Sequence, residues 1–498
     1  MTFGHHPLTR LAIALAGVTL ALGLRFGTFT AGGADSYGYV SQADLWLNGT
    51  LIIDQPLHDQ VTWRWANWTL SPLGYRPGET GGTMVPVYPP GLPLLMAAFK
   101  LIGGDVALFS VVPLLGALTV WLTYRLGLRL ASPPIAALAA FAMLVSPVFL
   151  FHLVWPMSDV PATAWWLAAI VTALGGSPLS AVLSGLAAAA AILTRPNLFP
   201  LAGLVLGLTL AHHGWNRVGL LRATAFAIAA LPGPIAVAII NNHLYGSPFA
   251  SGYGTVETIY ATQHFATNLL QYPMWLVQTQ TPFILLAFAA PLLLRRGGNP
   301  AASRLSLFAL IFFGGVLLMY LWYTPYPDWT FLRFLLPAIP LLLVAAAASF
   351  GELAPSSLRR RRIAFALVTI VLGLSGVWQG RGAFGSQAFE ARHQAAARFA
   401  AALPANAVFL CNQHSGSLRY YANRLTLRFE WLAPDVYVTA LDQLQQSGRP
   451  VFVVLDDRER ESFKARYSAV ADVSWLDRQP ALIAANSMYF YQLPSIER

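Results

Sequence analysis

The stretch DVALFSVVPLLGALTVWLTYRLG at residues 105–127 decides the fold class of this chain. It is apolar over the roughly 20 residues that a helix needs to cross a bilayer, and a helix satisfies its own backbone polar groups there. We therefore expect a polytopic α-helical membrane protein with about 11 transmembrane helices. The apolar stretches that lead to this number lie at 10–28, 105–127, 133–153, 159–175, 179–194, 197–212, 219–240, 279–294, 305–322, 333–350 and 363–379.

The composition agrees with this fold class, because 56% of the 498 residues are hydrophobic and only 10% are charged. Such a composition excludes a soluble globular protein. The formal net charge is +10, mostly from arginines beside span ends. These set the topology and meet anionic lipid headgroups, so we expect membrane lipids and no nucleic acid as partners. The single cysteine, Cys411, excludes an intrachain disulfide and a cysteine-based zinc site.

The gaps between the apolar stretches fall into two alternating sets. One set faces the cytoplasm by the positive-inside rule, and it contains Arg10, Arg125, Arg129, Arg217, Arg222, Arg295, Arg296, Arg304 and 359–362. The other set faces outward and carries Asp35, Asp159, Arg195, 241–248 and 323–333. We therefore expect a multi-pass protein of the cell inner membrane whose active site and C-terminal region are extracytoplasmic. A first span that is cleaved as a signal peptide remains an alternative to an uncleaved one.

The chain divides at about residue 380 into two regions of different composition. Residues 1–380 form the expected transmembrane domain, with outer loops at 30–104 and 241–277. In 381–498 we expect an extracytoplasmic α/β domain with a mostly parallel sheet, because strand and helix patterns alternate. No glycine-rich phosphate loop opens its helices, so nucleotide binding is not indicated. The strand patterns lie at 407–410, 450–456 and 487–493, and the helical patterns at 387–403, 435–447 and 457–468.

Two segments of the first outer loop are predicted to be interfacial helices. Residues 43–51 have mixed polarity, and 92–102 are apolar but too short to span and carry Lys100. If the second segment crossed the membrane, every later gap would change sides, and the arginines would face outward.

Two aspartates on the outer face are the candidate acids. Asp35 follows the first span closely, where a carboxylate is costly unless it is used or paired. Water, Arg25 or Arg76 would be an ordinary partner for it. Asp159 opens the fourth span, where a helix N-cap is the alternative role. If the two converge on one cavity, one acts as general base while the other tunes its pKa or binds a hydroxyl or a metal.

Three arginines break the charge bias of the outer face, namely Arg76, Arg195 and Arg333. A guanidinium at the outer edge of a span is suited to a phosphate group, which it clamps with two parallel hydrogen bonds. The alternatives are contact with ordinary lipid phosphate or, for Arg333, an ion pair with Asp328.

The order of these residues resembles a known family, the GT-C glycosyltransferases that use polyprenyl-phosphate sugars. Protein O-mannosyltransferases and lipid A aminoarabinose transferases are its better-known branches. The resemblance covers roughly residues 10–350, and no single motif carries it; the order and the shared sidedness do. The motifs are Asp35, Tyr88-Pro89-Pro90, Asp159, Thr194-Arg195-Pro196, Asn241-Asn242-His243-Leu244-Tyr245-Gly246-Ser247-Pro248 and Arg333-Phe334-Leu335-Leu336-Pro337.

The resemblance implies a GT-C-like fold with Asp35 as catalytic base and Asp159 as second acid. Tyr88 would shape the donor entrance, although some branches have Lys-Pro-Pro here and this chain lacks that lysine. A metal site built on an Asp-Glu pair loses a ligand, because Ser36 follows Asp35, and Glu79 or Asp59 would have to replace it. The sequence commits to no cofactor and leaves a divalent metal open. The predicted substrate-binding residues are Arg195, Arg333, Tyr88, Arg76, Tyr245 and Asn242.

The function that these features predict is transfer of a sugar from a polyprenyl-phosphate donor to a glycan, lipid or protein acceptor. Asp35 would take the acceptor proton, and polyprenyl phosphate would leave against Arg195, Arg333 or both in an inverting displacement. The 241–277 loop is a candidate mobile cover. A transporter or flippase of lipid-linked sugars, and a polyprenol-dependent ligase or polymerase, are the alternatives. The sequence shows no internal repeat, and its charges lie at the outer edge, which favours transfer over transport.

Overall fold

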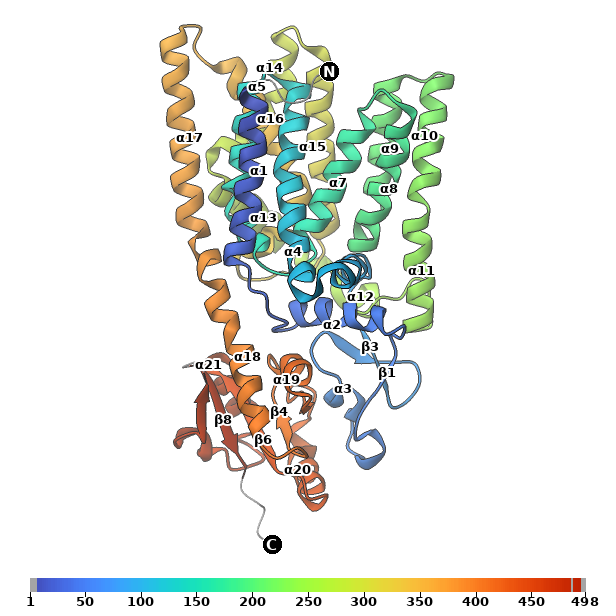
Figure 1. Cartoon of the computed structure of the whole chain (residues 1–498), viewed down its shortest axis with the longest axis vertical. Coiled ribbons are helices and arrows are strands. Elements are labelled where there is room, and N and C mark those ends of the chain that lie inside the picture. Colours follow the sequence, from blue (N-terminus) through green and yellow to red (C-terminus); the bar gives the residue numbers. More distant parts are fainter. Residues whose placement is uncertain (1–6, 485–486, 494–498) are drawn as a thin grey trace.

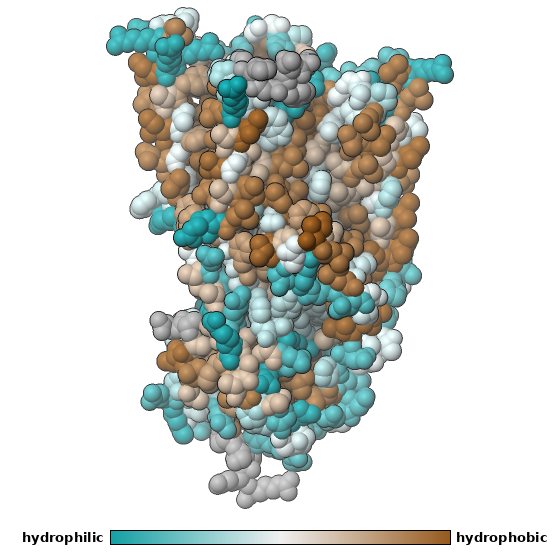
Figure 2. Space-filling view, in the orientation of Figure 1, coloured by the Kyte–Doolittle hydropathy of each residue, from teal (hydrophilic) through white to brown (hydrophobic). Residues whose placement is uncertain are grey.

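In the computed structural model, which describes residues 7–484 and 487–493, a helical bundle adjoins a smaller unit built on a β-sheet (Figure 1). Hydrophobic side chains cover the bundle, whereas hydrophilic ones gather at its far end and over the sheet unit (Figure 2). This distribution fits a bundle in lipid with a water-facing unit at one end. The sheet unit comprises residues 386–484 and 487–493.

The bundle places a helix or a helix pair in each predicted apolar stretch. Its helices are α1 (Pro7–Phe26), α4 (Gly91–Leu130), α5 (Pro133–Leu144), α6 (Pro147–Leu153), α7 (Asp159–Ala173), α8 (Pro178–Thr194), α9 (Leu201–His213), α10 (Arg217–Ala230), α11 (Pro232–Tyr245), α13 (Phe265–Gln280), α14 (Leu286–Arg296), α15 (Pro300–Tyr320), α16 (Ile339–Leu353) and α17 (Leu358–Gly380).

The protein is a multi-pass membrane protein, but the number of crossings is not fixed by helix length. Among the described residues, six helices are long and apolar enough to cross a membrane, or up to eight if each of two bent pairs is one span. The helices α7, α8 and α9 have 15, 17 and 13 residues, shorter than a straight crossing requires. The predicted number of about 11 is therefore not confirmed.

The first outer loop is more structured than its sequence pattern indicates. Helix α2 (Asp35–Leu47) begins at Asp35 rather than at residue 43, because residues 36–43 are buried and their environment overrides their mixed polarity. The helix ends before Gly49, whose φ of 74° favours glycine. The α4 axis breaks at Gly103 and Gly104, so that 91–102 is a separate segment of the length predicted for the second interfacial helix.

A three-stranded antiparallel sheet in this loop was not predicted from the sequence. Its order is β1-β3-β2, with β1 at Ile53–Asp54, β2 at Tyr75–Pro77 and β3 at Thr83–Pro86, and the short α3 (Ala66–Leu70) lies between β1 and β2. Strand β3 leads directly to Tyr88, whose ring packs on Gly38 of α2 so closely that a β-carbon on Gly38 would overlap it. The sheet thereby positions Tyr88 against the first turns of α2.

The sheet unit has the strand order β5-β4-β6-β8-β7. The predicted strands at 407–410, 450–456 and 487–493 contain β4, β6 and β8, and the predicted helices overlap α18, α20 and α21. The expected mostly parallel sheet is wrong, because only β4 pairs in parallel with β5 and β6, while β6–β8 and β7–β8 are antiparallel. The connection between β7 and β8 is too short for a crossover. The elements are α18 (Ser386–Ala402), β4 (Val408–Leu410), α19 (Ser415–Ala422), β5 (Leu425–Leu427), α20 (Tyr437–Gln446), β6 (Val451–Asp456), α21 (Asp457–Tyr467), β7 (Leu482–Ala484) and β8 (Met488–Gln492).

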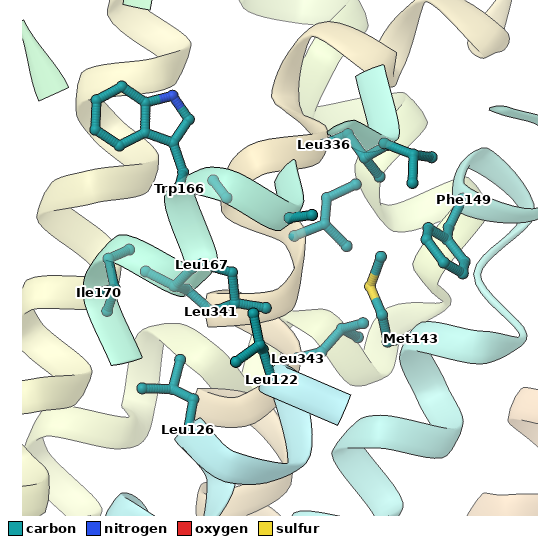
Figure 3. Packing of buried hydrophobic residues seen from close by; sticks show 14 of the residues in the cluster. Leu122, Leu126, Met143, Phe149, Trp166, Leu167, Ile170, Leu336, Leu341 and Leu343 are labelled. Atoms are coloured by element: carbon teal, nitrogen blue, oxygen red, sulfur yellow. The ribbon is translucent and has the colours of Figure 1, made fainter. Parts of the chain in front are cut away.

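The largest hydrophobic core lies within the bundle. Figure 3 shows side chains of α4, α5, α6 and α7 meeting those of α16 and of the 3-10 segment η5 (Trp329–Ala338). Trp166 of α7 is fully buried in it, two turns after Asp159. Dense packing of this kind resists displacement, so α7 and η5 provide a rigid base for Asp159 at the start of α7 and for Arg333 within η5.

Candidate active site

Five predicted site residues come together at the first residues of α2 and α7, just after α8, within η5 and just after β3. Asp35 and Asp159 are the first residues of α2 and α7, Arg195 directly follows α8, Arg333 lies in η5, and Tyr88 follows β3. Arg195 leaves the helical conformation, with φ −143°, because Pro196 disfavours helix at the preceding residue. The predicted convergence of two acids and two guanidinium groups is thus present in the structure.

Both carboxylate oxygens of Asp35 accept a hydrogen bond. The Tyr88 hydroxyl donates to Oδ1 at 2.6 Å, and Arg333 Nη1 donates to Oδ2 at 3.1 Å. Neither Arg25 nor Arg76 pairs with it. The Asp35 side chain is nevertheless 31% exposed, so one face of the carboxylate is accessible. Burial and the Asp35 charge raise the pKa of Tyr88 well above its usual range, which keeps its hydroxyl protonated as a donor.

Asp159 is enclosed, with its side chain only 1% exposed. Arg195 Nη2 donates to its Oδ1, and Arg333 Nη1 lies 3.8 Å from its Oδ2, so Arg333 bridges the two acids. The Asp159 carboxylate does not cap a helix; Ser158 precedes α7 and makes no side-chain cap bond. Asp328 accepts from the backbone N–H of Thr330 at 2.7 Å and forms no ion pair with Arg333.

The two arginines retain donors that the protein does not satisfy. Arg195 Nη1 and Arg333 Nε are buried and have no hydrogen-bond partner among the described residues. The Phe334 ring lies 5.8 Å from the Arg195 guanidinium and 5.4 Å from that of Arg333, which is within cation–π range. Buried donors without partners are costly, and an anion such as phosphate would satisfy them.

Solved glycosyltransferases align with most of this chain. ArnT from Cupriavidus metallidurans bound to undecaprenyl phosphate aligns with a TM-score of 0.58 at 15% identity, covering 94% of this chain and 97% of ArnT. This chain has the GT-C fold. The apo oligosaccharyltransferase of Archaeoglobus fulgidus aligns with a TM-score of 0.52 at 14% identity, over 93% of this chain and 71% of that one. The mycobacterial arabinofuranosyltransferase AftD gives 0.53 at 16%, over 90% and 35%. No protein-family model and no curated protein matches the sequence.

Three further residues predicted for the site make their contacts elsewhere. Arg76 Nη1 donates to the Ser251 carbonyl at 3.1 Å, and its guanidinium lies 5.6 Å from the Tyr245 ring. The Tyr245 hydroxyl donates to the Pro86 carbonyl at 2.8 Å. Asn242 is exposed on α11. Arg76 and Tyr245 therefore join the first outer loop to the 241–277 loop and do not contact the two acids.

Three residues around the candidate site, Tyr39, Ser158 and Tyr253, were not predicted from the sequence. The Tyr39 hydroxyl donates to Ser158 Oγ at 2.9 Å, and Arg195 Nε donates to the same oxygen at 3.4 Å. Tyr253 of the 241–277 loop presents its ring to Tyr88, with the centroids 6.0 Å apart. Tyr39 lies four residues after Asp35, which places both on the same face of α2. A helix predicted from Asp35 onward would therefore have indicated Tyr39. The Tyr253 position depends on a tertiary contact and leaves no signal in the sequence.

The residues present at this candidate site do not fit a metal ion. No group of three or more His, Cys, Asp or Glu that could hold one occurs among residues 7–484 and 487–493. Arg195 and Arg333 occupy the space around the acids and already neutralise them. Glu79, considered above as a substitute ligand, contacts Gly246 instead.

Proposed function

We propose that this chain is a membrane glycosyltransferase that moves a sugar from a polyprenyl-phosphate donor to a glycan, lipid or protein acceptor on the extracytoplasmic side of the inner membrane. The observation that carries this proposal is the meeting of a partly exposed carboxylate with two arginines whose buried donors lack partners. The ArnT structure holds undecaprenyl phosphate, and an A. fulgidus oligosaccharyltransferase structure holds a dolichol-phosphate. A lipid-linked donor also requires no nucleotide-binding motif.

Arg195 and Arg333 bind the donor phosphate in this proposal. Charge-assisted hydrogen bonds from guanidinium to phosphate are short and strong, and the unpartnered Arg195 Nη1 and Arg333 Nε are the donors that remain for it. Asp159 holds Arg195 in place. Because Asp159 is enclosed and already bonded to Arg195, it positions the guanidinium and does not take the acceptor proton.

Asp35 is the base. When the donor phosphate draws Arg333 toward itself, Asp35 Oδ2 is released, while Tyr88 continues to hold Oδ1. The acceptor hydroxyl then gives its proton to Oδ2, and its oxygen forms a bond to the anomeric carbon. The bond from that carbon to the phosphate oxygen breaks, and the electron pair leaves with polyprenyl phosphate. Preorganised positive charge on the leaving phosphate lowers the barrier, and attack opposite the leaving group inverts the anomeric centre.

The remaining parts of the proposal concern organisation. Residues 1–380 form the transmembrane domain, with about 11 crossings if the short helices also span, and 381–498 form the extracytoplasmic domain. The segment with Tyr253 is the cover of the acceptor side, since its ring already contacts Tyr88. A cover excludes water from the displaced phosphate.

The test is transfer by the full-length protein from a panel of radiolabelled polyprenyl-phosphate sugars, with Asp35→Asn as the informative variant. We expect the wild type to use at least one donor, and the variant to lose about 100-fold to 10,000-fold in transfer rate, the usual contribution of a general base. Asp328→Asn is the matched control, because Asp328 lies close to Arg333 in sequence but bonds to the backbone of Thr330. Wild-type turnover by Asp35→Asn would remove Asp35 from this role.

A further inference from the structure

The sheet unit contacts the chain just before Asp35. The Tyr421 hydroxyl accepts from the backbone N–H of Ala31 at 2.7 Å. Gly416 packs against the Tyr37 ring so closely that a β-carbon there would overlap the ring. Ser415 Oγ accepts from the backbone N–H of Leu73 at 3.1 Å. Helix α19 and its N-terminal flank therefore touch both the start of α2 and the loop that leads to Tyr88.

Gly32 is a second close approach in this contact. A β-carbon on Gly32 would lie 2.5 Å from the His393 ring and closer still to Glu390 Oε2, so only glycine fits without displacement of its neighbours. The Gly32 carbonyl also accepts from the backbone N–H of Tyr37 at 3.2 Å. It thus helps to close the first turn of α2, in which Asp35 lies.

The partners of Gly32 belong to a buried polar group, the histidine cluster, formed by Glu390, His393 and His414. The two imidazole rings stack with centroids 4.2 Å apart and an interplanar angle of 28°. Ser417 Oγ donates to the His414 carbonyl at 3.3 Å, so it accepts from His393 Nδ1 at 3.1 Å. His393 Nε2 then lies 3.6 Å from Glu390 Oε2, beyond hydrogen-bond distance, and burial raises the pKa of Glu390 and lowers that of His393, which favours the uncharged form of both groups.

The histidine cluster is unusual because it holds buried polar atoms that the described residues do not satisfy. Both ring nitrogens of His414 and Glu390 Oε2 are buried without hydrogen-bond partners among the described residues, which costs stability. Proteins hold such costs mainly at functional sites. Here the cluster lies at the face of the sheet unit that packs against Gly32. Gly32 is three residues before the proposed base, Asp35.

We propose that the sheet unit is part of the catalytic apparatus: its histidine cluster, packed on Gly32, fixes the start of α2 and so places the Asp35 carboxylate against Arg333 and Tyr88. This inference rests on the proposed function. Gly32, His393 and His414 are positioning residues that act through Asp35 and touch no substrate. Arg195, Asp159 and Arg333 belong to the bundle, so the phosphate subsite does not depend on this contact.

The test uses the full-length protein with Gly32→Ala, and Gly382→Ala as the matched control because a β-carbon on Gly382 meets nothing within 4 Å. We expect Gly32→Ala to lower kcat by about 10-fold to 100-fold, since a misplacement of about 1 Å has that effect. Its binding of undecaprenyl phosphate should stay within about twofold, because Arg195 and Arg333 remain in place. Hydrogen exchange of residues 31–39 should rise. Gly382→Ala should match the wild type in all three measurements.

Rescue separates positioning from general damage. The double variant Gly32→Ala with Glu390→Ala removes the nearest atom and gives the His393 ring room to move, so kcat should recover most of the loss. Gly416→Ala, on the other side of the junction, should repeat the kcat effect if Gly32→Ala does not fold. Wild-type kcat and unchanged exchange in both alanine variants would overturn the inference. If the wild type transfers no sugar at all, the proposed function fails. Even then, hydrogen exchange in residues 31–39 that is the same in Gly32→Ala as in the wild type would overturn the inference about the sheet unit.

Discussion

At the residue scale, the two aspartates of the site differ in exposure, and this difference separates their roles. The Asp35 side chain is 31% exposed, whereas that of Asp159 is 1% exposed. A base must reach the acceptor proton, which only the exposed carboxylate can do. The buried carboxylate instead compensates the charge of Arg195 and, across 3.8 Å, that of Arg333.

Asp159→Asn should therefore damage the protein in a way that Asp35→Asn does not. Removing one partner of a buried ion pair typically costs about 3–5 kcal/mol, so we expect a lower unfolding temperature and weaker binding of undecaprenyl phosphate together with lost transfer. Asp35→Asn should keep both stability and binding. Thermal unfolding and ligand binding of the purified variants measure this. An Asp159→Asn protein with wild-type stability and binding would contradict the positioning role.

The convergence of Asp35, Asp159, Arg195 and Arg333 could be predicted because each residue breaks the local charge pattern beside a span end. The ion pairs among these four residues could not be predicted, because they depend on how α2, α8 and η5 approach one another. Arg333 pairs with Asp35, which is 298 positions away in sequence, and not with its near neighbour Asp328. Arg76, Tyr245 and Asn242 share the outer face with these residues, but a shared face does not specify contact.

At the element scale, long apolar helices could be located from the sequence, and short elements could not. Strands β1, β2, β5 and β7 have two or three residues each, which is too few to show a period-2 pattern. The start of helix α2 was predicted at residue 43 instead of at Asp35. The residues before 43 form no apolar pattern in the sequence, although residues 36–43 are buried. The sheet is mixed because β8 runs antiparallel to β6. An alternation of helices and strands in the sequence does not determine the direction of this last strand.

A buried glutamate in the first turn of α21, Glu459, should make the stability of the sheet unit depend on pH. Burial raises the pKa of Glu459 to about 7, and its carboxylate accepts from the backbone N–H of Asp456 at 3.2 Å. Because the folded pKa lies above the unfolded value, this group's contribution to stability is complete below about pH 4.5 and is lost as the pH rises through 7. Burial lowers the pKa of His414, so that residue acts in the opposite direction, losing stability as the pH falls.

Glu459→Gln isolates the acidic contribution. We expect the opening free energy of β6, measured by hydrogen exchange in the full-length protein, to respond differently to a change from pH 5 to pH 8 in the two proteins. The wild type should lose more stability on going to pH 8 than the variant does, because only the wild type must ionise a buried carboxyl. Equal pH responses would show that Glu459 is not the group responsible.

At the scale of the whole molecule, the sheet unit and the first outer loop form one assembly. Arg419 Nη2 donates to the Leu70 carbonyl, and the Tyr420 hydroxyl donates to Asp44 Oδ2 at 2.9 Å. These contacts join segments more than 300 positions apart in sequence. Neither segment contains a sequence pattern that indicates contact with the other. The sequence therefore predicted a separate C-terminal unit but not its packing against the first outer loop.

The proposed topology can be checked by cysteine labelling. The native Cys411 is fully buried and gives little background. Arg64→Cys places a thiol at an exposed position of the outer loop, where the arginine side chain is 61% exposed, and Arg360→Cys places one at the predicted cytoplasmic end of α17. A membrane-impermeant maleimide should label the first in intact spheroplasts and the second only after permeabilisation. The reverse pattern would put Asp35 and its partners on the cytoplasmic side.

The most direct measurement is the affinity of the purified protein for undecaprenyl phosphate, compared between the wild type and Arg333→Gln. A hydrogen bond to a charged group contributes about 1.5–3 kcal/mol, so losing this guanidinium should weaken binding by about tenfold or more. Arg304→Gln, at the opposite end of the bundle, should bind as the wild type does. Equal affinity in all three proteins would contradict the account, because the lipid phosphate would then not rest on the arginines that the fold brings to Asp35.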